Sequence, residues 1–171
     1  MKTTPLSELL LPELQAELNK ARRMLERVPE GHNDFRPHPK SMSLIDLANH
    51  LATVSGLAGA ILLYPGVDLG GPNDPRQIVK EQTGAAVLSE FEKLAASSVA
   101  QLRVTTEEAF GEPWKATRQG NVMFSGTRYS AYRNIAVNHL IHHRAQLGVY
   151  LRMLDVPVPY SFGPSADEMP A

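Results

Sequence analysis

Four stretches of the chain repeat apolar residues at alternating spacings of three and four, and this period restricts the fold more than any other feature of the sequence. The period places the apolar side chains on one face of an α-helix, which must then be buried against another element. Four such helices with little sign of strands predict an all-α fold, an up-and-down-type four-helix bundle. The 171 residues suit one domain, with variable connections in residues 66–128 and an extended tail in residues 155–171.

Three of these helices are defined by their apolar stripes. The first stripe covers residues 11–28; Pro12 is expected in its first turn, where a missing N–H breaks no hydrogen bond, and Pro29 at its end. The third stripe covers residues 87–102. The fourth helix is expected to run from Tyr129 to Leu154.

The second helix has clear signals at both ends. Ser43, with Asp46 three residues later, forms a capping box at its start, and the helix should run to about Leu63, before a Pro-Gly pair. Further along, Asp74 and Pro75 could cap a short helical turn, which Gly84 would weaken.

The remaining segments have little regular pattern. Residues 105–127 are expected to be irregular, with one short helical turn at residues 106–110 and an extended piece near residues 122–124. Alternating prolines over residues 156–160 favour an extended conformation in the tail.

Charge and composition exclude several classes of partner. The 17 basic and 18 acidic residues form no basic run, which argues against nucleic acid and against an anionic membrane surface. Glu8 and Glu13 interrupt any apolar signal segment, and the uncharged stretch from Leu51 to Tyr64 is too short to span a bilayer. With no cysteine, disulfides and thiolate ligands are excluded. These features predict a cytoplasmic protein.

Three of the six histidines fall on apolar stripes. His139 and His143 are four residues apart on the fourth helix, which places them about 40° apart around its axis, inside the stripe that contains Tyr132, Ala136, Leu147, Tyr150 and Leu154. His50 lies within about 60° of the apolar residues on the second helix. Three imidazoles from two helices that face one core could bind one metal ion and leave positions open to water or substrate.

Other interpretations of these residues stay open. Each of the three could be a core histidine that is neutral and hydrogen-bonded to a neighbour. His142 is a competing ligand, although it lies about 100° from His143 on the helical wheel. His32 and His38 lie in a loop and have the pattern of surface residues, while Gln146 could support a ligand through a hydrogen bond.

The histidine pair does not have the pattern of a zinc peptidase helix. Those helices carry a glutamate directly after the first histidine as the general base, and here that position is Leu140. Arg36, Trp114, Tyr150 and Tyr160 are of types that line substrate pockets, and they are equally common as packing or surface residues.

Three ordered motifs resemble the DinB/YfiT-like superfamily. They are NHLIHHRAQL at residues 138–147, RPHPKSMSL at residues 36–44 followed by LANHL at residues 47–51, and YSFGPSADE at residues 160–168. The resemblance implies a four-helix bundle, commonly a homodimer, with one divalent metal ion held by His50, His139 and His143. Zinc or nickel is the expected ion, with iron or manganese as alternatives.

Characterised members of that family imply a reaction as well. Some transfer low-molecular-weight thiols to electrophiles, so this chain is expected to be a metal-dependent thiol S-transferase with a small-molecule substrate. A metal on three neutral imidazoles acidifies either a thiol or a water, so a hydrolase that uses a metal-bound hydroxide is the alternative. The second alternative is a non-enzymatic protein that binds a metal or a small ligand.

Overall fold

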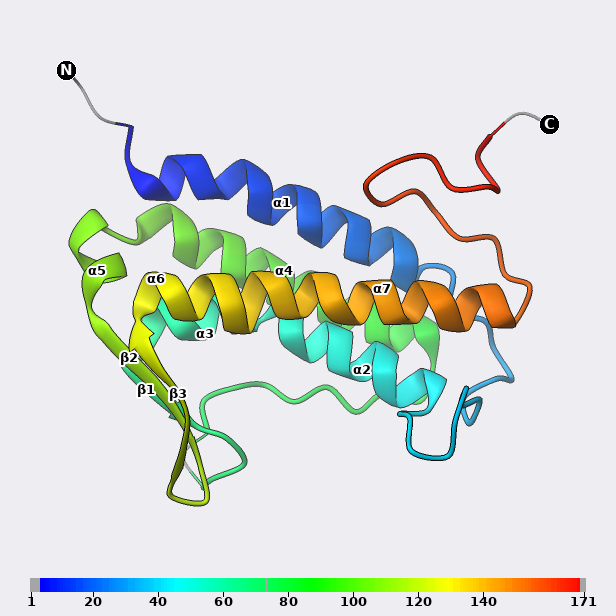
Figure 1. Cartoon of the computed structure of the whole chain (residues 1–171), viewed down its shortest axis with the longest axis horizontal. Helices are drawn as coiled ribbons and strands as arrows, with labels where there is room; N and C mark the ends of the chain where they lie inside the picture. The colour runs from blue at the N-terminus through cyan, green and yellow to red at the C-terminus, as the bar shows by residue number, and fades with distance from the viewer. Residues whose placement is uncertain (1–3, 73, 170–171) are drawn as a thin grey trace.

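Four helical segments pack alongside one another, as the apolar periods predict (Figure 1). They are listed in chain order: α1 (Leu6–Leu25), α2 and α3 (Leu44–Ser55 and Leu57–Leu63), α4 (Gly84–Val104), and the continuous run of α6 (Arg128–Ala131), the π-helix η1 (Tyr132–Val137) and α7 (Asn138–Met153). Helices α1 and α2 each contact both α4 and α7. This computed structural model describes residues 4–72 and 74–169.

A three-stranded sheet at one end of the bundle corrects the all-α prediction (Figure 1). Strand β1 (Gly66–Asp68) pairs in parallel with β2 (Pro113–Arg118), and β2 pairs antiparallel with β3 (Asn121–Thr127). The predicted extended piece falls inside β3, and the predicted helical turn matches α5 (Glu107–Gly111). The sequence did not predict the sheet because its strands are short and two of them pair across almost 50 residues.

The second helix is divided where one continuous helix was predicted. Ser98, on α4, accepts a hydrogen bond from the Gly59 N–H at 3.0 Å and donates one to the Ser55 carbonyl at 2.7 Å. These two backbone groups would otherwise bond each other across one helical turn, so the hydroxyl replaces that bond. The chain therefore bends at Gly56, between α2 and α3.

Two helices begin earlier than their sequence signals suggested. Helix α1 starts at Leu6, whose N–H donates to the Glu107 carboxylate at 2.8 Å, so Pro12 lies inside the helix and not in its first turn. Helix α4 begins at Gly84, with the Thr83 hydroxyl accepting from a backbone N–H of the first turn. A distant carboxylate cap cannot be seen in a local pattern, whereas the threonine cap can.

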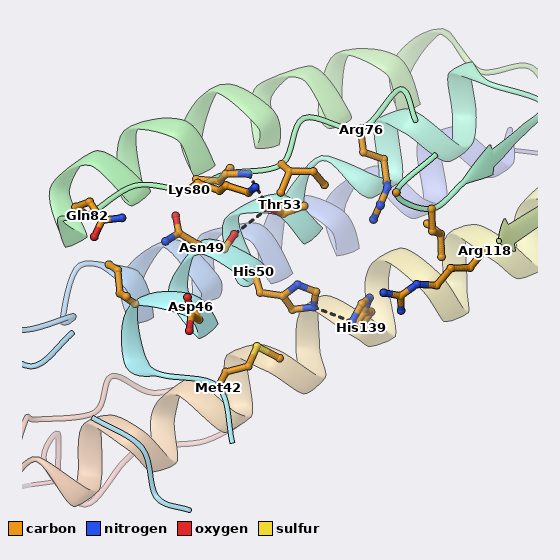
Figure 2. Close-up of a pocket in the computed structure, with 15 residues that line it drawn as sticks. Met42, Asp46, Asn49, His50, Thr53, Arg76, Lys80, Gln82, Arg118 and His139 are labelled. Carbon is orange, nitrogen blue, oxygen red and sulfur yellow. Dashed lines mark hydrogen bonds between the residues drawn. The ribbon is translucent and has the colours of Figure 1, made fainter. Parts of the chain in front are cut away.

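Residues 74–83 form an extended segment against α2, and the predicted helical turn at Asp74 is wrong. Side chains of α2 form hydrogen bonds with the backbone N–H and carbonyl groups of this segment. The Asn49 amide donates to the Glu81 carbonyl and accepts from the Glu81 N–H, both at 2.8 Å. The Thr53 hydroxyl, drawn in Figure 2, accepts from the Val79 N–H at 3.0 Å. A helical turn would need these backbone groups for its own bonds.

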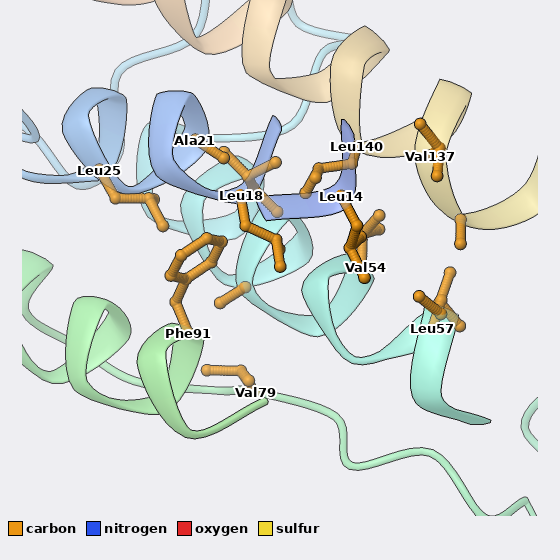
Figure 3. Packing of buried hydrophobic residues seen from close by; sticks show 14 of the residues in the cluster. Leu14, Leu18, Ala21, Leu25, Val54, Leu57, Val79, Phe91, Val137 and Leu140 are labelled. Carbon is orange, nitrogen blue, oxygen red and sulfur yellow. The ribbon is translucent and has the colours of Figure 1, made fainter. Parts of the chain in front are cut away.

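The α2–α3 segment, Leu44–Leu63, is long and apolar enough to cross a membrane by length and composition alone. However, 78% of its most apolar window is buried inside the bundle. Figure 3 shows Val54 beside Leu14 of α1, and Leu57 on the side of Val137 of η1. Packing in the core therefore accounts for the apolar composition of this segment, as the sequence predicted.

The tail after α7 contains no helix or strand over residues 155–169 and folds back along the bundle (Figure 1). Two acidic residues hold it there. Asp167 pairs with Arg152 of α7, and Glu168 accepts from Arg23 of α1 at 2.8 Å. The tail therefore contacts both helices, and its acidic pair belongs to the third motif found in the sequence.

Candidate metal centre

Three histidines from two helices converge at one point in the bundle. The Nε2 atom of His50 lies 3.3 Å from Nε2 of His139 and 3.0 Å from Nε2 of His143. One ring nitrogen from each of the three residues lies within 4.8 Å of the other two, which is an arrangement that could hold a metal ion. His143 is buried, while His50 and His139 are partly exposed.

The wide turn of η1 ends two residues before His139 and helps to orient its ring. In a π-helix the backbone bonds reach one residue further than in an α-helix, and such turns are frequent at functional sites. The Ile135 carbonyl, inside η1, lies 3.2 Å from Nδ1 of His139. One turn further along, Nδ1 of His143 lies 2.7 Å from the amide oxygen of Gln146.

These partners determine which ring nitrogens carry a proton. Both Ile135 and Gln146 offer oxygen acceptors, so Nδ1 of His139 and of His143 must donate, and their Nε2 atoms keep a lone pair. His50 can donate its Nε2 proton to only one of these two atoms at a time. At least one Nε2 lone pair is then left facing the others without a proton, and a cation would satisfy it.

The two nitrogen separations measured from His50 also fit an ion. Zinc binds histidine nitrogens at about 2.0–2.1 Å, so two ligands of a tetrahedral ion are about 3.3 Å apart, and ligands at right angles about 3.0 Å. The observed separations of 3.3 and 3.0 Å from His50 lie at these values. Imidazole ligands suit several transition metals, zinc, nickel, copper and iron among them.

Burial keeps these imidazoles neutral. Burial, the neighbouring His139 ring and the Arg76 guanidinium together lower the pKa of His50 to about 4, with burial the largest cause. Burial and the His50 and His139 rings likewise lower the pKa of His143 to about 4, against the opposing effect of the Gln146 hydrogen bond, and burial lowers the pKa of His139. At neutral pH the three rings are therefore unprotonated, which is the state that binds a metal.

A cleft of about 740 Å³ opens beside the histidines (Figure 2). His50 and His139 line it, and the extended segment with Arg76 and Lys80 forms one wall. Arg118, at the end of β2, lines another side. A ligand in this cleft could therefore reach the point where the three histidines meet.

The other histidines lie outside this group. His142 is exposed, although its ring centroid is 4.8 Å from that of His143. His32 and His38 are exposed in the loop before α2. The helical wheel therefore predicted correctly that His142 points away from the site that contains His139 and His143.

The four residues suggested as pocket lining do not line this cleft. Trp114 is buried and donates to the Tyr64 carbonyl at 3.0 Å, and Tyr150 donates to the Met42 carbonyl at 3.0 Å. Both are packing residues, while Arg36 and Tyr160 are exposed elsewhere.

The sequence analysis instead missed Asn49, Arg76 and Arg118, which all line the cleft. Asn49 had a local signal, because it is a polar residue on the apolar face of a helix directly before His50. The two arginines had none, since they come from an irregular segment and from a strand that the pattern did not show.

The hydrogen bond from His143 to Gln146 leads to a first prediction. Gln146→Ala should weaken zinc binding by about 10- to 100-fold, because the His143 ring loses the acceptor that fixes its tautomer and orientation. Competition with a chromophoric chelator measures the change. Gln146→Glu, which keeps an acceptor, is the matched control and should bind zinc at least as tightly as the wild type. Equal affinity in Gln146→Ala would mean that this contact does not support the ligand.

The fold and the three histidines together define a helical bundle that could hold a metal ion between facing helices. Residues 13–147 match the model of the DinB superfamily, and the chain belongs to that family. This confirms the resemblance to the family; the first two motifs lie inside the matched residues, and the third, at residues 160–168, lies outside them.

Two relatives show how far the similarity extends. The uncharacterized protein YjoA of Bacillus subtilis (strain 168) is 25% identical over 146 residues, which cover 85% of this chain and 89% of YjoA. The crystal structure of this DinB-like protein has a TM-score of 0.66 over 95% of this chain and 99% of that one, at 18% identity. A DinB-like protein from Bacillus cereus ATCC 10987 also has a TM-score of 0.66, over 91% and 97% of the two chains, at 19% identity.

Proposed function

We propose that this protein binds one divalent ion, zinc or nickel, through His50, His139 and His143 and transfers a low-molecular-weight thiol to an electrophilic small molecule. The observation that carries the proposal is the convergence of three neutral imidazoles beside an open cleft. A divalent ion held by uncharged ligands lowers the pKa of a thiol or a water that it binds, and this is the chemistry it supplies. The chain's own residues hold the ion and shape the cleft around it.

The cleft has few acidic residues that could act as a general base, and this favours thiol transfer over hydrolysis. Among the described residues that line the cleft, Asp46 alone is acidic. Its carboxylate accepts a hydrogen bond from the Ser43 hydroxyl at 2.6 Å at the start of α2. A metal-bound water has a pKa of about 7 and is only partly ionised at neutral pH, so a free base would assist its attack, whereas a metal-bound thiol is fully deprotonated and needs none. The cytoplasm, where thiols are kept reduced, is the compartment that such a reaction requires.

A thiol-conjugation assay tests this function. A free thiol of pKa about 8.5 is about 3% ionised at pH 7, so full ionisation should raise its rate with 1-chloro-2,4-dinitrobenzene by about 10- to 30-fold. We expect this acceleration with zinc- or nickel-loaded protein, and none with metal-free protein. Thioether absorbance and the loss of free thiol measure the reaction.

The loaded His38→Ala variant is the matched control and should react like the wild type, because His38 is exposed and outside the group. No acceleration with any small thiol while the ion stays bound would contradict thiol transfer and favour a binding protein. Release of acid from an ester, without thioether formation, would favour the hydrolase.

A further inference from the structure

Arg118 is held over the cleft by the geometry of the sheet. Trp114, Ala116 and Arg118 stand at every second position of β2; the first two are buried against the bundle, while Arg118 is exposed at the end of the strand. The Leu69 N–H donates to the Thr117 carbonyl at 2.7 Å and fixes the end of β2 beside the cleft. Figure 2 shows the Arg118 side chain extending from β2 toward His139.

The positive charge of Arg118 is not compensated by the protein. Among the residues that the structure describes, no acidic side chain forms an ion pair with Arg118. Arg76 lines the same cleft, but Asp74 accepts from its Nη2 at 2.6 Å and from its Nε at 2.9 Å. Arg118 is therefore a cation in the cleft that has its hydrogen-bond donors free for a ligand.

The chemistry of such a ligand follows from the charges around it. Three neutral imidazoles leave a bound divalent ion uncompensated, and Arg118 adds a further positive charge on the same cleft. A guanidinium binds a carboxylate through two parallel hydrogen bonds. A phosphate dianion would favour a second cation close to Arg118, but Arg76 is already neutralised by Asp74 and Lys80 lies in a part of the cleft away from His139 (Figure 2). A single carboxylate is the better match.

We propose that Arg118 binds a carboxylate of the small thiol, so that the substrate is a thiol acid held by its sulfur at the histidine centre and by its carboxylate at the end of β2. This inference rests on the proposed function, and it makes Arg118 the residue that selects acidic thiols over neutral ones.

Cobalt-loaded protein tests the inference without an activity assay. Two thiols of equal length, 3-mercaptopropionate and 3-mercapto-1-propanol, are titrated while the sulfur-to-cobalt charge-transfer absorbance is followed. We expect the wild type to bind the acid about tenfold more tightly, the size of one charge-assisted pair at a partly screened site. Arg118→Gln should bind both thiols equally, and Arg118→Lys should keep part of the preference.

Lys80→Gln is the matched control, because Lys80 lines the same cleft but lies beside Gln82, away from His139 (Figure 2). It should keep the preference for the acid. The inference is overturned if the wild type binds both thiols equally, if Arg118→Gln keeps the preference, or if Lys80→Gln loses it to the same extent. In all three cases the proposed thiol chemistry still stands.

Succinate separates failure of the inference from failure of the proposed function. If neither thiol produces the charge-transfer band, the proposed function fails. Succinate has no sulfur, and its binding is followed through the cobalt d–d bands. About tenfold weaker succinate binding in Arg118→Gln would still support a carboxylate site at Arg118, and unchanged binding would overturn it.

Discussion

Replacing His143 with alanine should remove the divalent ion from the purified protein. We expect about one ion per chain in the wild type and less than a tenth of that in His143→Ala. Two imidazoles remain after the change, and among the described residues no other histidine or acidic side chain belongs to the group. Mutation of a residue that only orients a metal ligand typically weakens metal binding by about 10- to 100-fold. Removal of a ligand itself should weaken binding by more than this. Elemental analysis of untagged protein measures the content.

The neighbouring His142→Ala variant is the matched control, since it removes an exposed imidazole one residue away. It should keep the ion, while His50→Ala and His139→Ala should lose it as His143→Ala does. Equal metal content in the wild type and His143→Ala would contradict the three-histidine site. The same conclusion would follow if the wild type bound no ion after zinc, nickel, iron and manganese had each been supplied.

The sequence predicted the helices because their signal is local. An apolar stripe with a period of about 3.6 residues can be recognised within a single turn or two, and all four stripes became packed segments. The break at Gly56 could not be predicted in this way, because it depends on a hydroxyl from Ser98, about 40 residues away. The sheet was missed for the same reason, because the three residues of β1 form a strand only through pairing with the distant β2.

The same distinction between local patterns and distant contacts applies to the site. The sequence placed His50, His139 and His143 on inward faces, and the structure brings these faces together. The cleft beside them depends on contacts between distant segments. Asn49 holds the backbone of the extended segment against α2, and pairing between strands places Arg118. Which residues could bind a metal was therefore predictable, and which residues would meet a substrate was not.

Replacing Glu17 with leucine should destabilise the fold by about 3–5 kcal/mol, because it leaves the buried Arg144 guanidinium without a counter charge. Glu17 on α1 and Arg144 on α7 form an ion pair whose side chains are 7% and 1% exposed. Burial raises the pKa of Glu17, but hydrogen bonds from Lys20 and Arg144 outweigh it and keep the pKa below its usual value. The carboxylate therefore stabilises the fold at neutral pH, and this contribution is lost as the pH falls below about 4.3 and through the folded-state pKa.

Urea unfolding of Glu17→Leu, Arg144→Met and the double variant distinguishes the two partners. Arg144→Met should cost less than Glu17→Leu, because Glu17 keeps a hydrogen bond from Lys20 at 2.7 Å, whereas Arg144 has Glu17 as its one ion-pair partner among the described residues. The double variant should recover part of the loss, since it buries no unpaired charge. A cost below about 1 kcal/mol for Glu17→Leu would contradict a buried pair. Arg144 directly follows His143, so an unchanged metal content in the folded variants would show that the pair stabilises the contact between α1 and α7 without forming part of the metal centre.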